Sequence, residues 1–130
     1  MLERAGGGAE APGAAGRAAK EEPGAHEPIV GLPCEGCEAV YEGMPPRASL
    51  ASRARIAPAD SPGEAMRIEG AVFDPEGRPA PGVIVYAYQT DAGGIYPTDE
   101  RMRDTAAHRH GTLRGWAVTD VAGGYRFDTI

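Results

Sequence analysis

The pattern of hydrophobic and polar positions changes near residue 66. From there on, short apolar runs alternate with turns rich in Gly, Pro and Asp, a spacing that predicts four strands. In the first run, Met66, Ile68 and Val72 alternate with polar positions, which predicts a strand with one buried face. The second run, residues 83–88, is apolar on both sides and predicts a strand that is covered on both faces.

Two further strands are predicted close to Ile130. Residues 116–119 form the third and residues 125–130 the fourth, while residues 89–112 form a long loop before them. Short strands that are joined by Gly-rich turns, with no helix between them, favour an all-β fold. We therefore expect a partial antiparallel β-sandwich of about four strands.

The first half of the chain has few of the large side chains that a core requires. Residues 1–28 are mostly Ala, Gly, Glu and Pro, which bury too little surface to offset the entropy of ordering, so they predict a disordered N-terminal leader. Prolines interrupt residues 29–65 and predict an irregular arm, with one or two helical turns around residues 49–55. The sandwich is expected at residues 66–130.

Charge and hydropathy exclude some classes of protein. The net charge of −6 argues against nucleic-acid binding, which needs a basic surface. No apolar stretch approaches the ~20 residues that a membrane-spanning helix needs, so we expect no membrane partner. The N-terminus has no hydrophobic segment typical of a secretory signal, and we expect a cytoplasmic protein.

The second strand runs into a turn and a lone tyrosine in AYQTDAGGIY, residues 87–96. A tyrosine in such a place most often packs its ring and hydrogen-bonds its hydroxyl. Its setting favours a functional role. GAVFDPEGRPAPGVIVYAYQTD leads into it, LRGWAVTDVAGGYRFDTI follows it, and the arm carries PCEGCEAVYEGMP. Together, and in this order, these segments resemble the intradiol ring-cleavage dioxygenases of the catechol and protocatechuate dioxygenase type, over about residues 29–130.

The resemblance implies a non-haem Fe(III) enzyme of aromatic compound catabolism, which uses O2 to cleave catechol-type diols between the two hydroxyls. In that family two Tyr and two His bind the iron, and Tyr96 is the position of the first tyrosinate. Anionic oxygen ligands suit a hard ferric ion. The other three ligands follow the segment that matches 113–130, so they are absent from this chain. We therefore expect a truncated chain that is inactive alone, and assign no catalytic residue; a homo-oligomer is compatible with the resemblance.

His108 and His110 form an HxH sequence that does not match the family's histidine pair, which lies beyond the second tyrosine. We interpret them as part of a solvated loop, and a share in shaping the substrate pocket is the alternative.

Cys34 and Cys37 form a single CxxC, without the further ligands that a structural zinc site needs. We expect free thiols or a local disulfide, with metal binding as a weaker alternative. Asp91 and Asp120 each lie between a Thr and a glycine turn, where an Asp side chain commonly bonds to the backbone.

A second interpretation belongs to another class, the non-catalytic β-sandwich binding modules of the transthyretin or carboxypeptidase-regulatory type. These share the patterns GxVxDxxGxPxxGVxV and TDxxGxYxF, which residues 66–85 and 117–127 fit equally well. The segments AYQTDAGGIY and LRGW favour the dioxygenase, because a binding module has no structural need of them.

Overall fold

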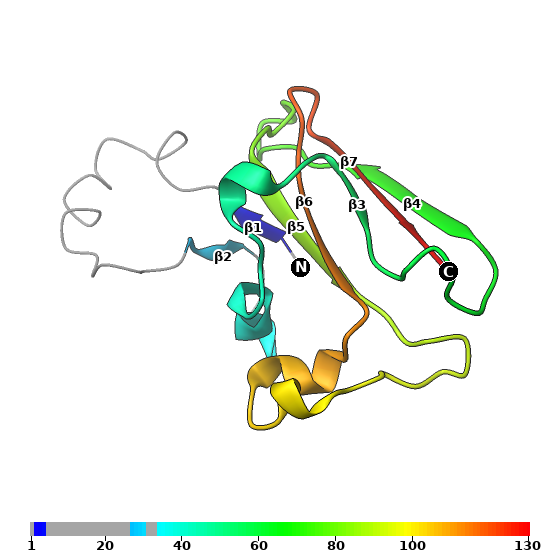
Figure 1. Cartoon of the computed structure of the whole chain (residues 1–130). Coiled ribbons are helices and arrows are strands. Elements are labelled where there is room, and N and C mark those ends of the chain that lie inside the picture. Colours follow the sequence, from blue (N-terminus) through cyan, green and yellow to red (C-terminus); the bar gives the residue numbers. More distant parts are fainter. Residues whose placement is uncertain (1, 5–26, 31–33) are drawn as a thin grey trace.

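The computed structural model describes residues 2–4, 27–30 and 34–130, which form two facing β-sheets (Figure 1). The strands are β1 (Leu2–Arg4), β2 (Ile29–Val30), β3 (Arg53–Arg55), β4 (Met66–Ala71), β5 (Val83–Tyr88), β6 (Arg114–Val118) and β7 (Gly124–Thr129). Short 3-10 helices are η2 (Cys37–Tyr41), η3 (Arg47–Ser49), η4 (Glu100–Met102) and η5 (Ala106–His110). The predicted all-β sandwich is confirmed.

The first sheet has the strand order β2-β1-β5-β6, and the second has the order β3-β7-β4. All pairs are antiparallel except β3 with β7, which is parallel. The four strands that the sequence predicts correspond to β4, β5, β6 and β7. In the register of the first sheet Tyr86 lies opposite Trp116, and in that of the second Ile68 lies opposite Phe127.

The core lies between the sheets. Val85 and Ala117 from the first sheet meet Phe127 from the second, and Ile56, just after β3, completes the buried cluster. Gly115 allows the close approach, because a Cβ there would lie 2.9 Å from Ile56 Cγ1 and 3.3 Å from a Phe127 ring carbon. The core is therefore packed against a backbone position that has no side chain.

The predicted covering of β5 on both faces is also confirmed. Val85 points into the core, whereas Ile84 and Tyr86, on the opposite face, are buried as well. That second face lies under the arm, where the indole Nε1 of Trp116 donates to the carbonyl of Val40 at 2.7 Å. The arm thus acts as a third layer over the first sheet.

The arm is more regular than the sequence predicts. In the described part of the arm η2 and η3 are the helical segments, and residues 53–55 form β3 instead of a helical turn. The reason is an alternation that prolines obscure: Arg53 and Arg55 are exposed, while Ala54 and Ile56 turn toward the core. Ala54 lies opposite Phe127 in the register, which adds β3 to the second sheet.

Part of the predicted leader is also a strand. β1 pairs with β5, with Leu2 opposite Val85. Pairing satisfies the backbone groups on the edge of β5 that β6 leaves open. Within the predicted leader, residues 1 and 5–26 lie outside the described residues.

β4 is a strand as predicted, but the prediction of a buried face is wrong for its first half. Met66 is 44% exposed and Ile68 is 37% exposed. β4 lies at the edge of the second sheet and pairs only with β7, so among the described residues little covers its inner side. Val72, just after the strand, does pack on the core.

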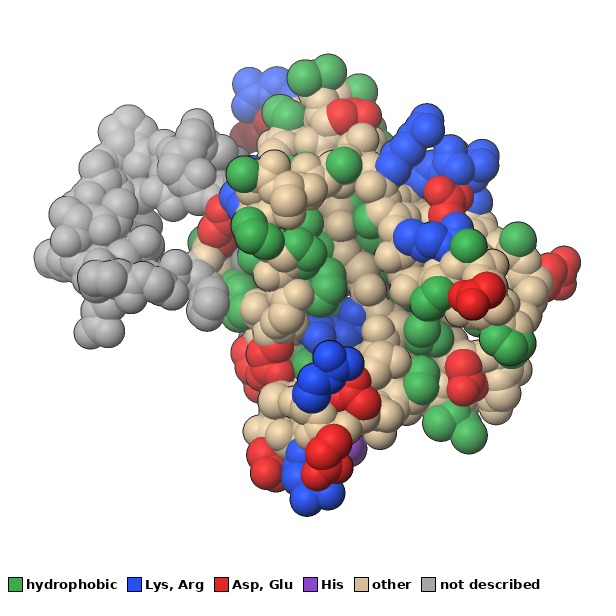
Figure 2. Space-filling model, in the orientation of Figure 1, with side chains coloured by type: hydrophobic (Ala, Val, Ile, Leu, Met, Phe, Trp, Pro, Cys, Tyr) green, Lys and Arg blue, Asp and Glu red, His purple; other side chains and the backbone are tan. Residues whose placement is uncertain are grey.

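Charges on the surface are mixed. On the face shown in Figure 2, basic side chains have acidic ones beside them. Asp128 illustrates this pattern, because it pairs with Arg126 at 2.8 Å and with Arg67 at 3.4 Å. No helix in the described part of the chain is long and apolar enough to cross a membrane.

We predict that Gly115→Ala lowers the free energy of unfolding by about 1–3 kcal/mol, because the new methyl group must displace Ile56 or Phe127 in a packed core. Urea denaturation of the variant should show a lower midpoint with an unchanged slope. An unchanged midpoint would show that the sheets can separate at this position without cost.

Candidate functional site

The turn after β5 is organised by one carboxylate. Asp91 Oδ1 accepts hydrogen bonds from the backbone N–H groups of Gly93 at 2.9 Å and Ile95 at 3.1 Å. The backbone N–H of Asp91 also donates to the carbonyl of Ile95 at 2.7 Å. These bonds confirm the predicted role of Asp91 and fix the backbone immediately before Tyr96. Asp120 makes the equivalent bonds to the N–H groups of Ala122 and Gly124.

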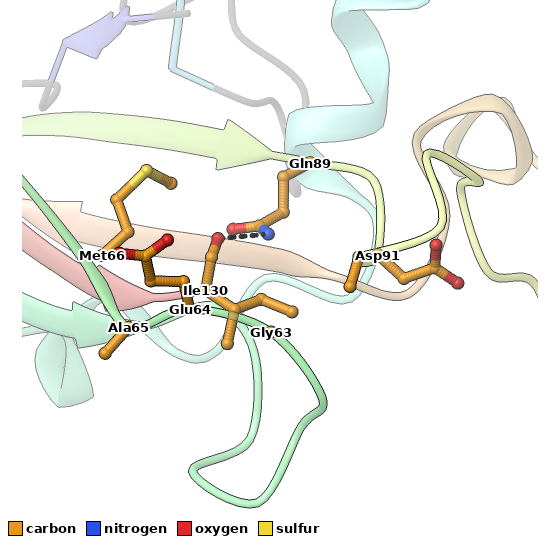
Figure 3. A pocket seen from close by; sticks show the side chains of 8 residues that line it. Gly63, Glu64, Ala65, Met66, Gln89, Asp91 and Ile130 are labelled. Atoms are coloured by element: carbon orange, nitrogen blue, oxygen red, sulfur yellow. Dashed lines mark hydrogen bonds between the residues drawn. The ribbon is translucent and has the colours of Figure 1, made fainter.

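Gln89, at the end of β5, links the two sheets. Its Nε2 donates to the carbonyl of Ile130 at 3.1 Å (Figure 3). Its Oε1 accepts from the hydroxyl of Thr129. Beside it lies a pocket of about 490 Å³. The pocket is lined by Gly63, Glu64, Ala65, Met66, Gln89, Asp91, Ala92 and Ile130. Tyr96 is not part of this lining.

Tyr96 lies on the surface beside Tyr88. Its side chain is 43% exposed, and the centres of the two rings are 5.9 Å apart. The next residue is held by the backbone, because the N–H of Thr112 donates to the carbonyl of Pro97 at 2.6 Å. Gly111 makes this contact feasible: its φ is 76°, and a Cβ there would lie 2.8 Å from the Pro97 oxygen.

A network of aromatic rings and hydrogen bonds supports Tyr88. The ring of His110 stacks on that of Tyr88, with centres 3.8 Å apart and planes within 2°. His110 Nδ1 lies 2.7 Å from the hydroxyl of Tyr86, which in turn accepts from Nε of Arg114 at 2.8 Å. The network thus joins His110 of η5 to Tyr86 and Tyr88 of β5 and, through Tyr86, to Arg114 of β6.

The expectation of a solvated histidine pair is wrong for His110. His110 is only 4% exposed, whereas His108 is exposed as expected. The cause is the 3-10 geometry of η5, which has three residues per turn and so places residues 107 and 110 on one face. Ala107 is buried with His110. The spacing of Ala107 and His110 was the available sequence signal.

The hydrogen-bond directions in this network suit a neutral His110. Arg114 can only donate, so the Tyr86 oxygen accepts from it. The Tyr86 hydroxyl keeps its hydrogen, which it can donate to Nδ1 of His110 when the histidine proton is on Nε2. Burial, and then the charge of Arg114, hold the pKa of His110 below its ordinary value, while Glu38 and Glu42 act in the opposite direction. Burial also raises the pKa of Tyr86, which keeps its hydroxyl protonated.

The arm is fastened to the same network. Nη2 of Arg114 donates to the carbonyls of Ala39 at 2.7 Å and of Glu42. The carboxylate of Glu42 accepts from the N–H groups of Ala106 at 3.1 Å and Ala107 at 3.0 Å. Glu42 therefore binds the start of η5, the helix that carries His110.

Cys34 and Cys37 form a local disulfide, one of the two predicted states. The loop that they close contains Gly36, whose Cβ, if present, would lie 3.4 Å from Nε2 of His110. Glu35 in the same loop pairs with Arg109 of η5. The disulfide loop thus lies over the edge of His110 that faces away from Tyr86. The cytoplasmic location stays a prediction.

Comparison with known families covers strands β3 to β7 and the turn that precedes Tyr96. The profile of the family described as dioxygenase matches residues 43–130. This match spans more than half of the chain and includes both AYQTDAGGIY and LRGW. The chain belongs to the intradiol ring-cleavage dioxygenase family. The alternative of a transthyretin-like binding module is thereby set aside.

Solved structures of intradiol dioxygenases are similar to this chain. 3-Chlorocatechol 1,2-dioxygenase from Rhodococcus opacus 1CP is 27% identical with a TM-score of 0.46 over 58% of this chain and 29% of its own. Catechol 1,2-dioxygenase from Pseudomonas arvilla C-1 is 27% identical with a TM-score of 0.48 over 62% of this chain and 25% of its own. An intradiol ring-cleavage dioxygenase from Tetranychus urticae is 27% identical with a TM-score of 0.47 over 62% of this chain and 42% of its own.

This chain therefore spans less than half the length of each of these dioxygenases. A search of curated proteins finds no match.

Intradiol dioxygenases generally use Fe(III), and the described residues alone do not fit such an ion. They include no group of three or more His, Cys, Asp or Glu side chains placed to bind a metal. Nδ1 of His110 is engaged with Tyr86 and its Nε2 lies against the Gly36 loop, so this histidine is not available beside Tyr96. Tyr96 is one ligand candidate, and a single ligand does not hold a ferric ion.

We predict that His110 makes the stability of this dioxygenase chain depend on pH. Its pKa is lower in the folded than in the unfolded chain, where it is about 6.5, so the unfolded chain takes up the proton first. The free energy of unfolding should therefore fall as the pH drops below about 6.5 and should level off below the folded pKa. Urea denaturation at several pH values measures this, and His110→Phe should lose this component while His108→Ala keeps it.

We also predict that Cys34→Ser combined with Cys37→Ser lowers the free energy of unfolding by about 2 kcal/mol, the loop-closure value for so short a loop. A reducing agent should produce the same loss in the original chain. It should have no effect on the double variant, which serves as the control. Equal stability with and without reductant in the original chain would contradict the prediction.

Proposed function

We propose that this chain forms part of a ferric intradiol dioxygenase that cleaves catechol-type diols with O2, and that Tyr96 is one of its tyrosinate ligands. Membership of the family supports the class of reaction. The observation that carries the role of Tyr96 is its place in the fold. It follows a carboxylate-organised turn at the end of the central strand, with its side chain 43% exposed.

The surroundings of Tyr96 suit a ligand better than a core residue. A tyrosine of the core buries its ring, as Tyr86 does at 2% exposure. Tyr96 instead keeps much of its side chain accessible while its backbone is fixed on both sides, by Asp91 before it and by Thr112 after it. A fixed backbone with an accessible phenol is what metal binding requires of a ligand residue.

The roles of the other residues follow from their contacts. Asp91 shapes the turn, Gln89 holds the end of β5 against β7, and Tyr88 lies against the ring of Tyr96. None of these side chains forms an acid–base pair with another. In this proposal the described residues orient one ligand, and the remaining ligands come from outside residues 1–130.

The choice of catechol-type substrates rests on the family. Two of the solved structures named above are a 3-chlorocatechol and a catechol 1,2-dioxygenase, and their partial overlap with this chain does not select between these substrates. The proposal therefore names the class of diol alone.

The test is ferric-iron binding by the product of the gene read beyond Ile130, together with this chain alone as a reference. We predict that the longer product, loaded with Fe(III), shows a visible tyrosinate-to-iron absorption band and consumes O2 with catechol. Tyr96→Phe should weaken iron binding by at least about 100-fold and abolish the band, since it removes a direct ligand. This chain alone should bind iron weakly at most.

Tyr125→Phe is the matched control, because Tyr125 lies in β7 beside Phe127 and away from the turn. It should leave the band unchanged. A band of full strength in Tyr96→Phe would refute the assignment of Tyr96, and a longer product that binds no iron would refute the ferric enzyme.

A further inference from the structure

Two contacts join the segment around Tyr96 to the segment around His110. One is the backbone bond from Thr112 N–H to the carbonyl of Pro97, at 2.6 Å. The other is a contact of side chains through Tyr88, whose ring meets both His110 and Tyr96. The backbone bond fixes the position of the main chain next to Tyr96, but it does not determine the rotamer of the Tyr96 side chain. The ring contact acts on the side chain.

The ring of Tyr88 needs support to serve as a fixed surface. It belongs to the exposed end of β5 and is 42% exposed. Its stack on His110 covers one face of the ring with an almost parallel imidazole. The ring of Tyr96 is inclined by 48° to that of Tyr88, and the ring centres are 5.9 Å apart, a separation within the range of aromatic pairs. Of these three rings, only that of His110 is buried.

His110 is itself held from several directions. Its Nδ1 bonds to Tyr86, whose hydroxyl is bound by Arg114, and its helix η5 is bound by Glu42. The Gly36 loop closes over Nε2. The buried imidazole is thus a rigid base on which the exposed ring of Tyr88 rests.

We propose that His110 is a positioning residue for Tyr96, acting through the ring of Tyr88. Its importance for chemistry rests on the proposed function, in which Tyr96 is a metal ligand, but the positioning itself does not depend on metal. An aromatic pair favours its contact geometry by about 2- to 12-fold in population, enough to select among the rotamers of an exposed side chain. A preselected rotamer spares the ligand the entropy of ordering when it binds.

The test uses the metal-free chain with ring-labelled tyrosine and measures NMR signals of Tyr96. In the original chain, the ring protons of Tyr96 should show cross-relaxation with those of Tyr88 and shifts away from free-tyrosine values. His110→Ala should remove these cross-peaks and move the shifts toward the free values. His110→Phe, which keeps a flat ring on Tyr88 but loses the bond to Tyr86, should restore most of the effect.

Two further variants keep the test decisive. His108→Ala removes the other histidine of the same 3-10 helix, which is exposed, and should leave the Tyr96 signals unchanged. If His110→Ala does not fold, Tyr88→Leu removes the intermediate ring while it spares the bond of His110 to Tyr86, and it should release Tyr96 in the same way.

The outcomes separate the two proposals. A folded His110→Ala or Tyr88→Leu variant with unchanged Tyr96 signals overturns the positioning role, even if its thermal stability falls. Released Tyr96 signals support that role whether or not the longer product binds iron. If the longer product binds no iron while Tyr96 keeps its cross-peaks with Tyr88, the proposal of a ferric enzyme is refuted and the positioning role of His110 is not.

Discussion

The guanidinium of Arg114 is the group on which the site depends. From one position on β6 it donates to the hydroxyl of Tyr86 and to the carbonyls of Ala39 and Glu42. It also lies over the rings of Tyr86 and Trp116, at 5.4 and 4.8 Å from their centres, as a cation does in a cation–π contact. A planar group with several donors in a fixed fork can join strand and arm at once, a geometry that a lysine ammonium does not offer.

This arrangement explains why the arm is fastened so firmly to the first sheet. The outer face of β5 carries Ile84 and Tyr86, which would be costly to leave in water. Covering that face with η2 brings buried carbonyls against it, and each of these needs a donor. Arg114 and the indole of Trp116 supply the donors. Burial of apolar surface and satisfaction of the backbone are thus met by the same two side chains.

The sequence predicts those parts of the molecule that short-range patterns determine. The strands β4 to β7 follow from apolar runs and turn residues, and the bonds of Asp91 follow from its place before glycines. The parallel pairing of β3 and the exposure of Met66 depend on strand order, which no local pattern encodes. The burial of His110 could have been predicted only from its spacing of three residues from Ala107, which is the repeat of a 3-10 helix. The charged residues of this segment instead suggested that it is exposed to solvent. Tyr96 was identified through family resemblance, but its neighbours Tyr88 and His110 come together only in three dimensions.

The side chains of the site become more exposed from its hydrogen-bonded centre toward the surface. Arg114, Tyr86 and His110 form hydrogen bonds around a largely buried centre, and the exposed rings of Tyr88 and Tyr96 extend from it toward the surface. Side chains that meet a ligand must be accessible, and accessible side chains lose their order first. Support from a buried imidazole resolves that conflict without burying the phenol. A second buried ring in place of Tyr88 would hold Tyr96 more firmly but would also close the surface on which it is exposed. The stack of one exposed ring on one buried ring is therefore the arrangement that keeps Tyr96 both placed and open.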